Sequence, residues 1–153
     1  EIANKLHRFI RDKTGVYDPY RLIKTKEIEE AQKAIHRFHT AFPETLEGSI
    51  KYSCLGNSMD FFCHDSFTIE GFDFSGDIDK ITKEIYTKGD VVLMFADNVG
   101  EFLFDIKLIG FLEDIGKTVY YAVKENPIQN DLSLPDVERF GFRKVFPGSR
   151  TGF

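Results

Sequence analysis

An unbroken run of six apolar residues, Val91 to Ala96, is the feature that most limits how this chain can fold. Such a run without polar alternation is typical of a β-strand that is buried on both faces, as in a parallel sheet. Asp97-Asn98 follows the run directly, and a helix-like stretch comes next. Ligands of open α/β sheets collect at the carboxyl ends of the strands. We therefore expect a buried strand over 91–96 with a polar ligand site at its end.

The rest of the second half alternates between helix-like and strand-like segments. The pattern predicts a helix over about 99–115 that ends at Gly116, a strand over 118–123, a short helix over 132–140 and a third strand over 143–146. Strand–helix–strand units of this kind are right-handed and give a parallel sheet. The second half is therefore predicted to be a Rossmann-like α/β domain over residues 89–153.

The first half carries apolar residues at helical spacing. Helices are predicted over 1–12, after Thr25, over 49–55 and over 77–87, the last with Ser75 as its N-cap. Ile28, Ala31, Ile35 and Phe38 form the apolar face of the second helix, and its charged residues are expected on the other face.

The predicted fold class is thus α/β, with a helical N-terminal subdomain over 1–88 packed on the Rossmann-like parallel-sheet domain. Residues 67–74 fit either a short strand or an extended loop. The sequence starts and stops within segments that look structured, so we expect a fragment whose sheet is incomplete at its C-terminal end.

The composition excludes several classes of partner. The formal net charge of −5 argues against a nucleic-acid surface or an anionic membrane surface, because either needs a basic patch. No apolar stretch is long enough to span a membrane, and no signal peptide is recognisable. Cys54 and Cys63 form neither a disulfide framework nor a paired metal motif, which favours reduced thiols in a cytoplasmic protein. The oligomeric state is left open.

Polar residues follow each of the three predicted strands: Asp97-Asn98 the first, Lys124 and Asn130-Asp131 the second, and Ser149-Arg150 the third. The carboxyl ends of parallel strands meet at one edge of the sheet, so these groups are expected to converge. Carboxylate and amide oxygens suit Mg²⁺ or Mn²⁺. Lys124, Arg150 and a helix N-terminus would add the positive potential that a phosphoryl group needs.

A purely structural interpretation of the same residues stays open. Asn98 and Glu101 have the spacing of a capping box at a helix start. Asn130-Asp131 fits a simple turn, and Lys124 fits a solvated side chain. Val99 occupies the position where phosphatases that form an aspartyl-phosphate carry a second aspartate, so water activated by a metal is favoured over a covalent intermediate.

Several short motifs follow one another in order along most of the chain: Asp18-Pro19-Tyr20 with Lys24, Gly56-Asn57-Ser58-Met59-Asp60-Phe61, Asp97-Asn98-Val99-Gly100-Glu101, Phe104-Asp105, Val123-Lys124 with Pro127-Ile128, Asn130-Asp131, and Gly148-Ser149-Arg150-Thr151-Gly152. This ordered set resembles the DUF89 family of metal-dependent damage-control phosphatases, also called the ARMT1-like or AF1104-like domain. The chain departs from the family at Leu132-Ser133, where many members have Ala-Thr. The N-terminal CxxC region of some members and the later Lys-Gly-x-x-Asn element are absent.

The resemblance implies a helical subdomain beside a Rossmann-like domain, and hydrolysis of phosphate esters of small metabolites, such as damaged sugar phosphates or phosphopantetheine-type compounds. It implies a divalent metal (Mn²⁺, Co²⁺, Ni²⁺ or Mg²⁺) held by Asp97, Asn98 and Asp131. Asp97, Lys124 and Asp131 would be the catalytic residues. The residues expected to bind the phosphorylated substrate are Asn57, Asp60, Glu101, Lys124, Ser149 and Arg150.

Two other functions remain open on the sequence. One is a non-catalytic module that binds metal or phosphate and has the same fold. The other is methyl transfer to a protein carboxylate, which is disfavoured because no glycine-rich cofactor loop follows the first strand.

Overall fold

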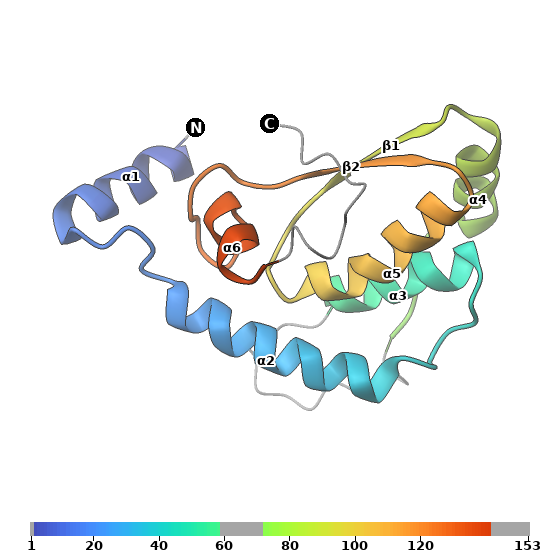
Figure 1. Cartoon of the computed structure of the whole chain (residues 1–153), viewed down its shortest axis with the longest axis horizontal. Coiled ribbons are helices and arrows are strands. Elements are labelled where there is room, and N and C mark those ends of the chain that lie inside the picture. The colour runs from blue at the N-terminus through green and yellow to red at the C-terminus, as the bar shows by residue number, and fades with distance from the viewer. Residues whose placement is uncertain (1, 59–71, 142–153) are drawn as a thin grey trace.

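The chain forms a two-stranded parallel sheet that is covered on one face by helices from both halves of the sequence (Figure 1). The computed structural model describes residues 2–58 and 72–141. Strand β1 (Val91–Phe95) pairs with β2 (Thr118–Ala122), in a register that runs from Val91 opposite Thr118 to Phe95 opposite Ala122. Helix α5 (Glu101–Asp114) connects the two strands. The predicted strand–helix–strand order is therefore confirmed, whereas the strand predicted over 143–146 lies outside the described residues.

Strand β1 is buried on one face only, so the prediction of burial on both faces is wrong for the described part of the chain. Val91, Leu93 and Phe95 are 61%, 56% and 76% exposed, while Val92 and Met94 between them are partly buried. The reason is that α3 (Leu46–Ser58) and α5 lie on the same side of the sheet (Figure 1). No described helix covers the opposite side, so the apolar residues that point there contact solvent.

The remaining helices are α1 (Ile2–Thr14), α2 (Arg21–Phe38), α4 (Ile78–Thr87) and α6 (Leu134–Arg139). Helix α2 begins at Arg21, earlier than predicted, because the Asp18 carboxylate accepts the Tyr20 N–H at 3.0 Å and the turn leads directly into the helix. Residues 72–74 belong to neither helix nor strand, which fits the extended-loop alternative over that part. None of the described helices is long and apolar enough to cross a membrane.

Side-chain caps and a glycine turn set the helix ends. The N-cap of α4 is Asp77, whose carboxylate accepts the Lys80 N–H at 3.0 Å, so the prediction of Ser75 is wrong. Helix α5 ends at Asp114 with Ile115 as its C-cap, one residue before the predicted Gly116. Gly116 has φ +85°, and the Gly116 and Lys117 N–H groups bond to the carbonyls of Glu113 and Leu112, which makes a Schellman motif.

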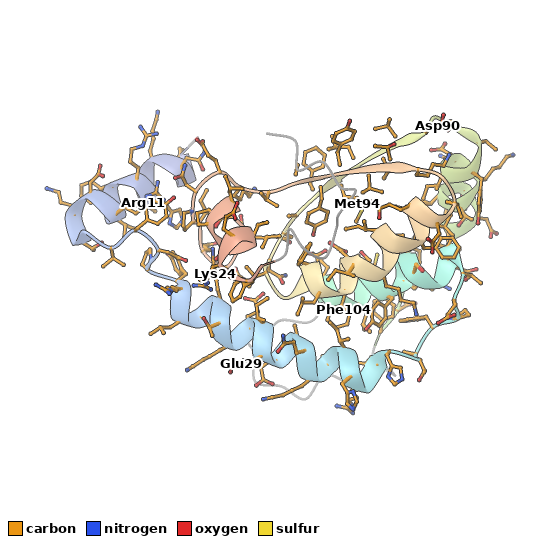
Figure 2. The ribbon with its side chains drawn as sticks, in the orientation of Figure 1. Arg11, Lys24, Glu29, Asp90, Met94 and Phe104 are labelled. Carbon is orange, nitrogen blue, oxygen red and sulfur yellow. The ribbon has the colours of Figure 1, made fainter. Side chains whose placement is uncertain are left out.

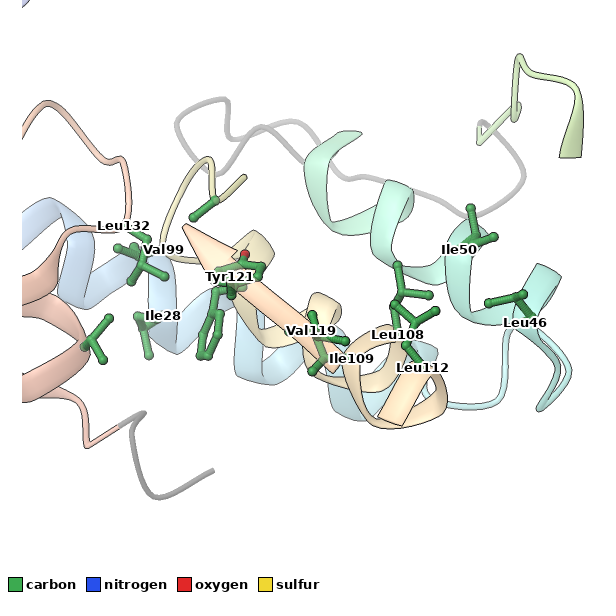
Figure 3. Close-up of a cluster of buried hydrophobic side chains, with 13 residues drawn as sticks. Ile28, Leu46, Ile50, Val99, Leu108, Ile109, Leu112, Val119, Tyr121 and Leu132 are labelled. Carbon is green, nitrogen blue, oxygen red and sulfur yellow. The ribbon is translucent and has the colours of Figure 1, made fainter. Parts of the chain in front are cut away.

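The helical segment and the α/β segment share one hydrophobic core. Figure 3 shows side chains of α2 and α3 beside those of α5 and β2, and the labelled members of this cluster are Ile28, Leu46, Ile50, Val99, Leu108, Ile109, Leu112, Val119, Tyr121 and Leu132. A second, smaller cluster lies between α2, α3 and α5 and includes Leu55 and Phe104, both fully buried. The predicted α/β class, with the N-terminal helices packed on the α/β segment, is confirmed.

The close packing of α3 on α5 gives a testable prediction. A Cβ atom on Gly56 would lie 2.7 Å from Cβ and Cγ of Phe104, far inside van der Waals contact. We expect Gly56→Ala to lower the free energy of unfolding by about 1–3 kcal/mol, the usual cost of overpacking a core. Urea unfolding measures this change.

Gly110 is the matched control, because a Cβ there meets no heavy atom within 4 Å and the residue lies inside α5. Gly110→Ala should raise stability by about 0.5–1 kcal/mol through its better helix propensity. Equal stability of the wild type and Gly56→Ala would contradict the close approach of α3 and α5.

Candidate active site

Two backbone segments pair at the carboxyl ends of the strands, and this pairing builds the site. The segment after β1 runs antiparallel to residues 130–132: the Leu132 N–H donates to the Asp97 carbonyl at 2.7 Å, and the Val99 N–H donates to the Asn130 carbonyl at 3.0 Å. Asn98 and Asp131 lie opposite one another in this pairing. The three residues expected to hold a metal are therefore adjacent in space.

Residues 132–134 also pair with the end of β2. The Lys124 N–H donates to the Leu132 carbonyl at 3.0 Å, and the Leu134 N–H donates to the Lys124 carbonyl at 2.8 Å. Residues 130–134 thus lie between the two strand ends and bring Lys124 to the metal candidates. The Lys124 ammonium lies 3.7 Å from the Asp131 carboxylate, with about half of the lysine side chain exposed.

Asn57, at the end of α3, connects two of the carboxylates. Its Nδ2 lies 3.1 Å from a carboxylate oxygen of Asp97 and 3.1 Å from one of Glu101. The Asn98 side-chain oxygen accepts the N–H of Glu101, the first residue of α5, at 2.7 Å. An amide oxygen has two lone pairs, so Asn98 can keep this hydrogen bond and still offer one lone pair to a metal.

The residues present fit a divalent cation. Asp97, Asn98 and Asp131 offer two carboxylates and one amide oxygen, a hard donor set. Burial raises the pKa of Asp131, and the nearby Asp97 charge raises it further, although Lys124 opposes the shift. Burial likewise raises the pKa of Glu101 to about 7, with Asp105 and Asp97 adding to the effect and the Asn57 hydrogen bond opposing it. A bound cation would stabilise these crowded carboxylates in their charged form.

The proposed donor set contains only two carboxylates, so it needs the amide oxygen of Asn98 as its third protein donor. Within residues 2–58 and 72–141, no three His, Cys, Asp or Glu side chains come together as a metal site. Asp60, Ser149 and Arg150, which were expected to bind substrate, lie outside the described residues.

Asp105 forms a buried polar network one helical turn beyond Glu101. Its carboxylate accepts hydrogen bonds from the Ser53 hydroxyl and from the Tyr121 hydroxyl, the latter at 2.5 Å. Only 3% of Asp105 is exposed, and burial raises its pKa. The network joins α3, α5 and β2 directly behind the site.

Two charged residues of α2 are buried, which the sequence did not predict. Glu27 was expected on the outer face of this helix, and Lys24, quoted as part of a family motif, was placed before the helix start; they are 3% and 0% exposed. Both carboxylate oxygens of Glu27 are engaged: one accepts the Gly100 N–H at 3.0 Å and the other accepts Nδ2 of Asn130 at 3.1 Å. Their spacing was the available signal, because Lys24 and Glu27 continue the helical period of Ile28 and Ala31 towards the N-terminus.

Comparison with known proteins points to a single family. The sequence matches the family model of the damage-control phosphatase ARMT1-like domain over residues 1–144. It is 29% identical over 161 aligned positions to damage-control phosphatase PH1575 of Pyrococcus horikoshii, with 97% of this chain and 53% of the relative covered. The crystal structure of that DUF89 family protein at 2.04 Å resolution superposes with a TM-score of 0.70 and 28% identity, over 88% of this chain and 50% of the other. The chain thus spans about half the length of the relative.

Proposed function

Because the chain belongs to the damage-control phosphatase ARMT1-like family, we propose that it is a metal-dependent phosphatase acting on phosphate esters of small metabolites. The observation that carries this proposal is the pairing of residues 97–99 with residues 130–132, which brings Asp97, Asn98 and Asp131 together beside Lys124. The curated relative, itself named a damage-control phosphatase, supports the same class of reaction.

Each described residue of the site has a role in this proposal. Asp97, Asn98 and Asp131 would hold the metal, which when bound supplies a Lewis acid and a more acidic water. Lys124 would place its positive charge against the phosphoryl oxygens. Asn57 would orient the carboxylates of Asp97 and Glu101, since it contacts both.

The exposure of the site suits a small, soluble substrate. Asp97, Asn57 and Lys124 are all exposed, so a phosphate ester can reach them from solvent. We expect a sugar phosphate or a phosphopantetheine-type compound, and Mn²⁺, Co²⁺, Ni²⁺ or Mg²⁺ as the metal. Cys54 is a free thiol, which suits a reducing compartment such as the cytoplasm.

The test is release of inorganic phosphate by the purified chain. The protein is first stripped of metal with a chelator and then assayed on p-nitrophenyl phosphate and on a panel of sugar phosphates, with each of the four metals in turn. We expect phosphate release only when a metal is added, and loss of release when EDTA is added afterwards.

The two alternatives give different results in the same set of measurements. A non-catalytic module would bind Mn²⁺ and phosphate by calorimetry and release no phosphate from any ester. A carboxyl methyltransferase would bind S-adenosylmethionine and transfer its methyl group to a protein carboxylate. Either result, together with no phosphate release under any metal, would refute the proposed phosphatase.

A further inference from the structure

We propose that Glu27 is a positioning residue of this site, whose carboxylate holds the loop after β1 against the loop that carries Asp131. This inference rests on the proposed function, because it concerns the geometry of the same metal ligands. Glu27 comes from α2, whereas the expected ligands all come from the α/β segment. It would set the spacing of the ligands without touching the metal or the substrate.

The contacts of Glu27 reach both halves of the site. Its Oε1 accepts the N–H of Gly100, two residues after Asn98, and its Oε2 accepts Nδ2 of Asn130, the residue directly before Asp131. A single carboxylate therefore bridges the two loops, at 3.0 Å on one side and 3.1 Å on the other.

Filling space in the interior does not explain why a carboxylate occupies position 27. Taking a carboxylate out of water costs free energy unless hydrogen bonds compensate, and only 3% of Glu27 is exposed. Its pKa is about 7, raised by burial and lowered in part by the Gly100 and Asn130 hydrogen bonds and by Lys24. An apolar side chain would fill the same space without the desolvation cost, but it would leave the Gly100 N–H and the Asn130 amide without an acceptor.

Lys24, one turn earlier on α2, contacts the chain just after Asp131, at Ser133 and Asp136. Its ammonium lies 2.6 Å from the Asp136 carboxylate and 3.5 Å from the Ser133 hydroxyl. Lys24 thus holds the end of the 130–134 segment. Glu27 contacts both this segment and the loop after β1, and its two hydrogen bonds add to the backbone pairing of 97–99 with 130–132. Glu27 is therefore the residue of α2 whose loss should change the distance between the two loops.

The experiment compares Mn²⁺ affinity, measured by calorimetry, with the steady-state parameters for phosphate release. We expect Glu27→Ala to bind Mn²⁺ about 10- to 100-fold more weakly than the wild type, the usual effect of losing a residue that orients metal ligands. Glu27→Gln keeps the length of the side chain and an acceptor for the Gly100 N–H, and Asn130 can turn its amide to meet the new NH₂ group. We expect this variant to retain most of the wild-type affinity.

Two control variants separate positioning from general destabilisation. Glu29→Ala removes an exposed carboxylate from the outer side of the same helix (Figure 2) and should leave Mn²⁺ affinity unchanged. Leu112→Ala should lower the melting temperature through the core at the far end of α5, yet bind Mn²⁺ as the wild type does while folded. Wild-type affinity in Glu27→Ala, or an equal loss in Leu112→Ala, would overturn the inference. An equal loss in Glu27→Gln would also overturn it, because the charge rather than the bridge would then matter.

Hydrogen exchange on the metal-free protein gives a measurement that does not depend on activity. In Glu27→Ala, we expect amides in 97–100 and 130–133 to exchange at least about 10-fold faster relative to those in 104–112, because the two loops separate locally. Unchanged relative exchange would refute the bridge. If the wild type binds Mn²⁺ but releases no phosphate, the phosphatase proposal fails, while affinity and exchange still decide the role of Glu27.

Discussion

Replacing Lys24 with methionine is expected to lower the free energy of unfolding by about 3 kcal/mol, near the lower end of the range for breaking a buried ion pair. Lys24 and Asp136 are 0% and 1% exposed, and the ammonium lies 2.6 Å from the carboxylate. Methionine fills the volume of the lysine stem but leaves the Asp136 charge without this partner. We choose the lower end because Arg139 stays 3.8 Å from Asp136 and the Ser133 N–H still donates to it.

Urea unfolding of three variants tests this prediction. Lys24→Met with Asp136→Asn should be more stable than Lys24→Met alone, because the double variant removes both members of the pair and leaves no Asp136 charge without its lysine. Lys33→Met is the control on the same helix: Lys33 pairs with Glu30 at 2.7 Å on the exposed surface, so its loss should produce little measurable change. A Lys24→Met variant as stable as the wild type would show that the buried pair does not hold α2 to α6.

Replacing Asp131 with asparagine is expected to lower kcat/KM for phosphate release by about 10²- to 10³-fold, comparable to the loss of one preorganised charge-stabilising group. The substitution keeps the shape of the side chain and removes the negative charge beside Lys124. Mn²⁺ affinity, measured by calorimetry, should fall as well. Asp97→Asn should behave in the same way, because Asp97 supplies the other carboxylate of the site.

The Asp131→Asn variant should not owe its loss of activity to unfolding. The pKa of Asp131 is raised in the folded state, so this carboxyl contributes most to stability at low pH and costs stability as the pH rises above its unfolded value. Removing the charge should therefore leave the metal-free protein at least as stable at pH 7. Asp90→Asn is the control, an exposed carboxylate at the opposite end of β1 (Figure 2). Full activity in Asp131→Asn would refute its role as a ligand.

The order of the elements could be predicted because local patterns determine it. The apolar run before Asp97 and the β-rich run after Gly116 became β1 and β2, and the residues between them became α5. Whether β1 is buried on one face or on both could not be predicted, because it depends on which segments cover the sheet. An apolar sequence shows that a face can be buried, not that it is.

The site was predictable in part. Parallel strands bring their carboxyl ends together, and this rule places Asp97 near Lys124. The antiparallel pairing of 97–99 with 130–132 depends on how residues 124–131 turn back, and no periodic pattern encodes that turn. Glu27 was missed for a different reason: a charged residue in an amphipathic helix is assigned to its outer face, unless a buried partner elsewhere in the chain is known.

The one-turn spacing of Lys24 and Glu27 has a consequence for attempts to transplant the site. A shortened protein beginning at residue 89 would keep Asp97, Asn98 and Asp131. It would lose the Lys24 ammonium that pairs with Asp136. It would also lose the Glu27 carboxylate that accepts hydrogen bonds from the Gly100 N–H and the Asn130 side-chain amide. The proposed ligands lie in one segment of the chain, and the residues proposed to align them lie in another. A designed host for this site would therefore need a helix that presents a lysine and a glutamate three residues apart, in addition to the sheet.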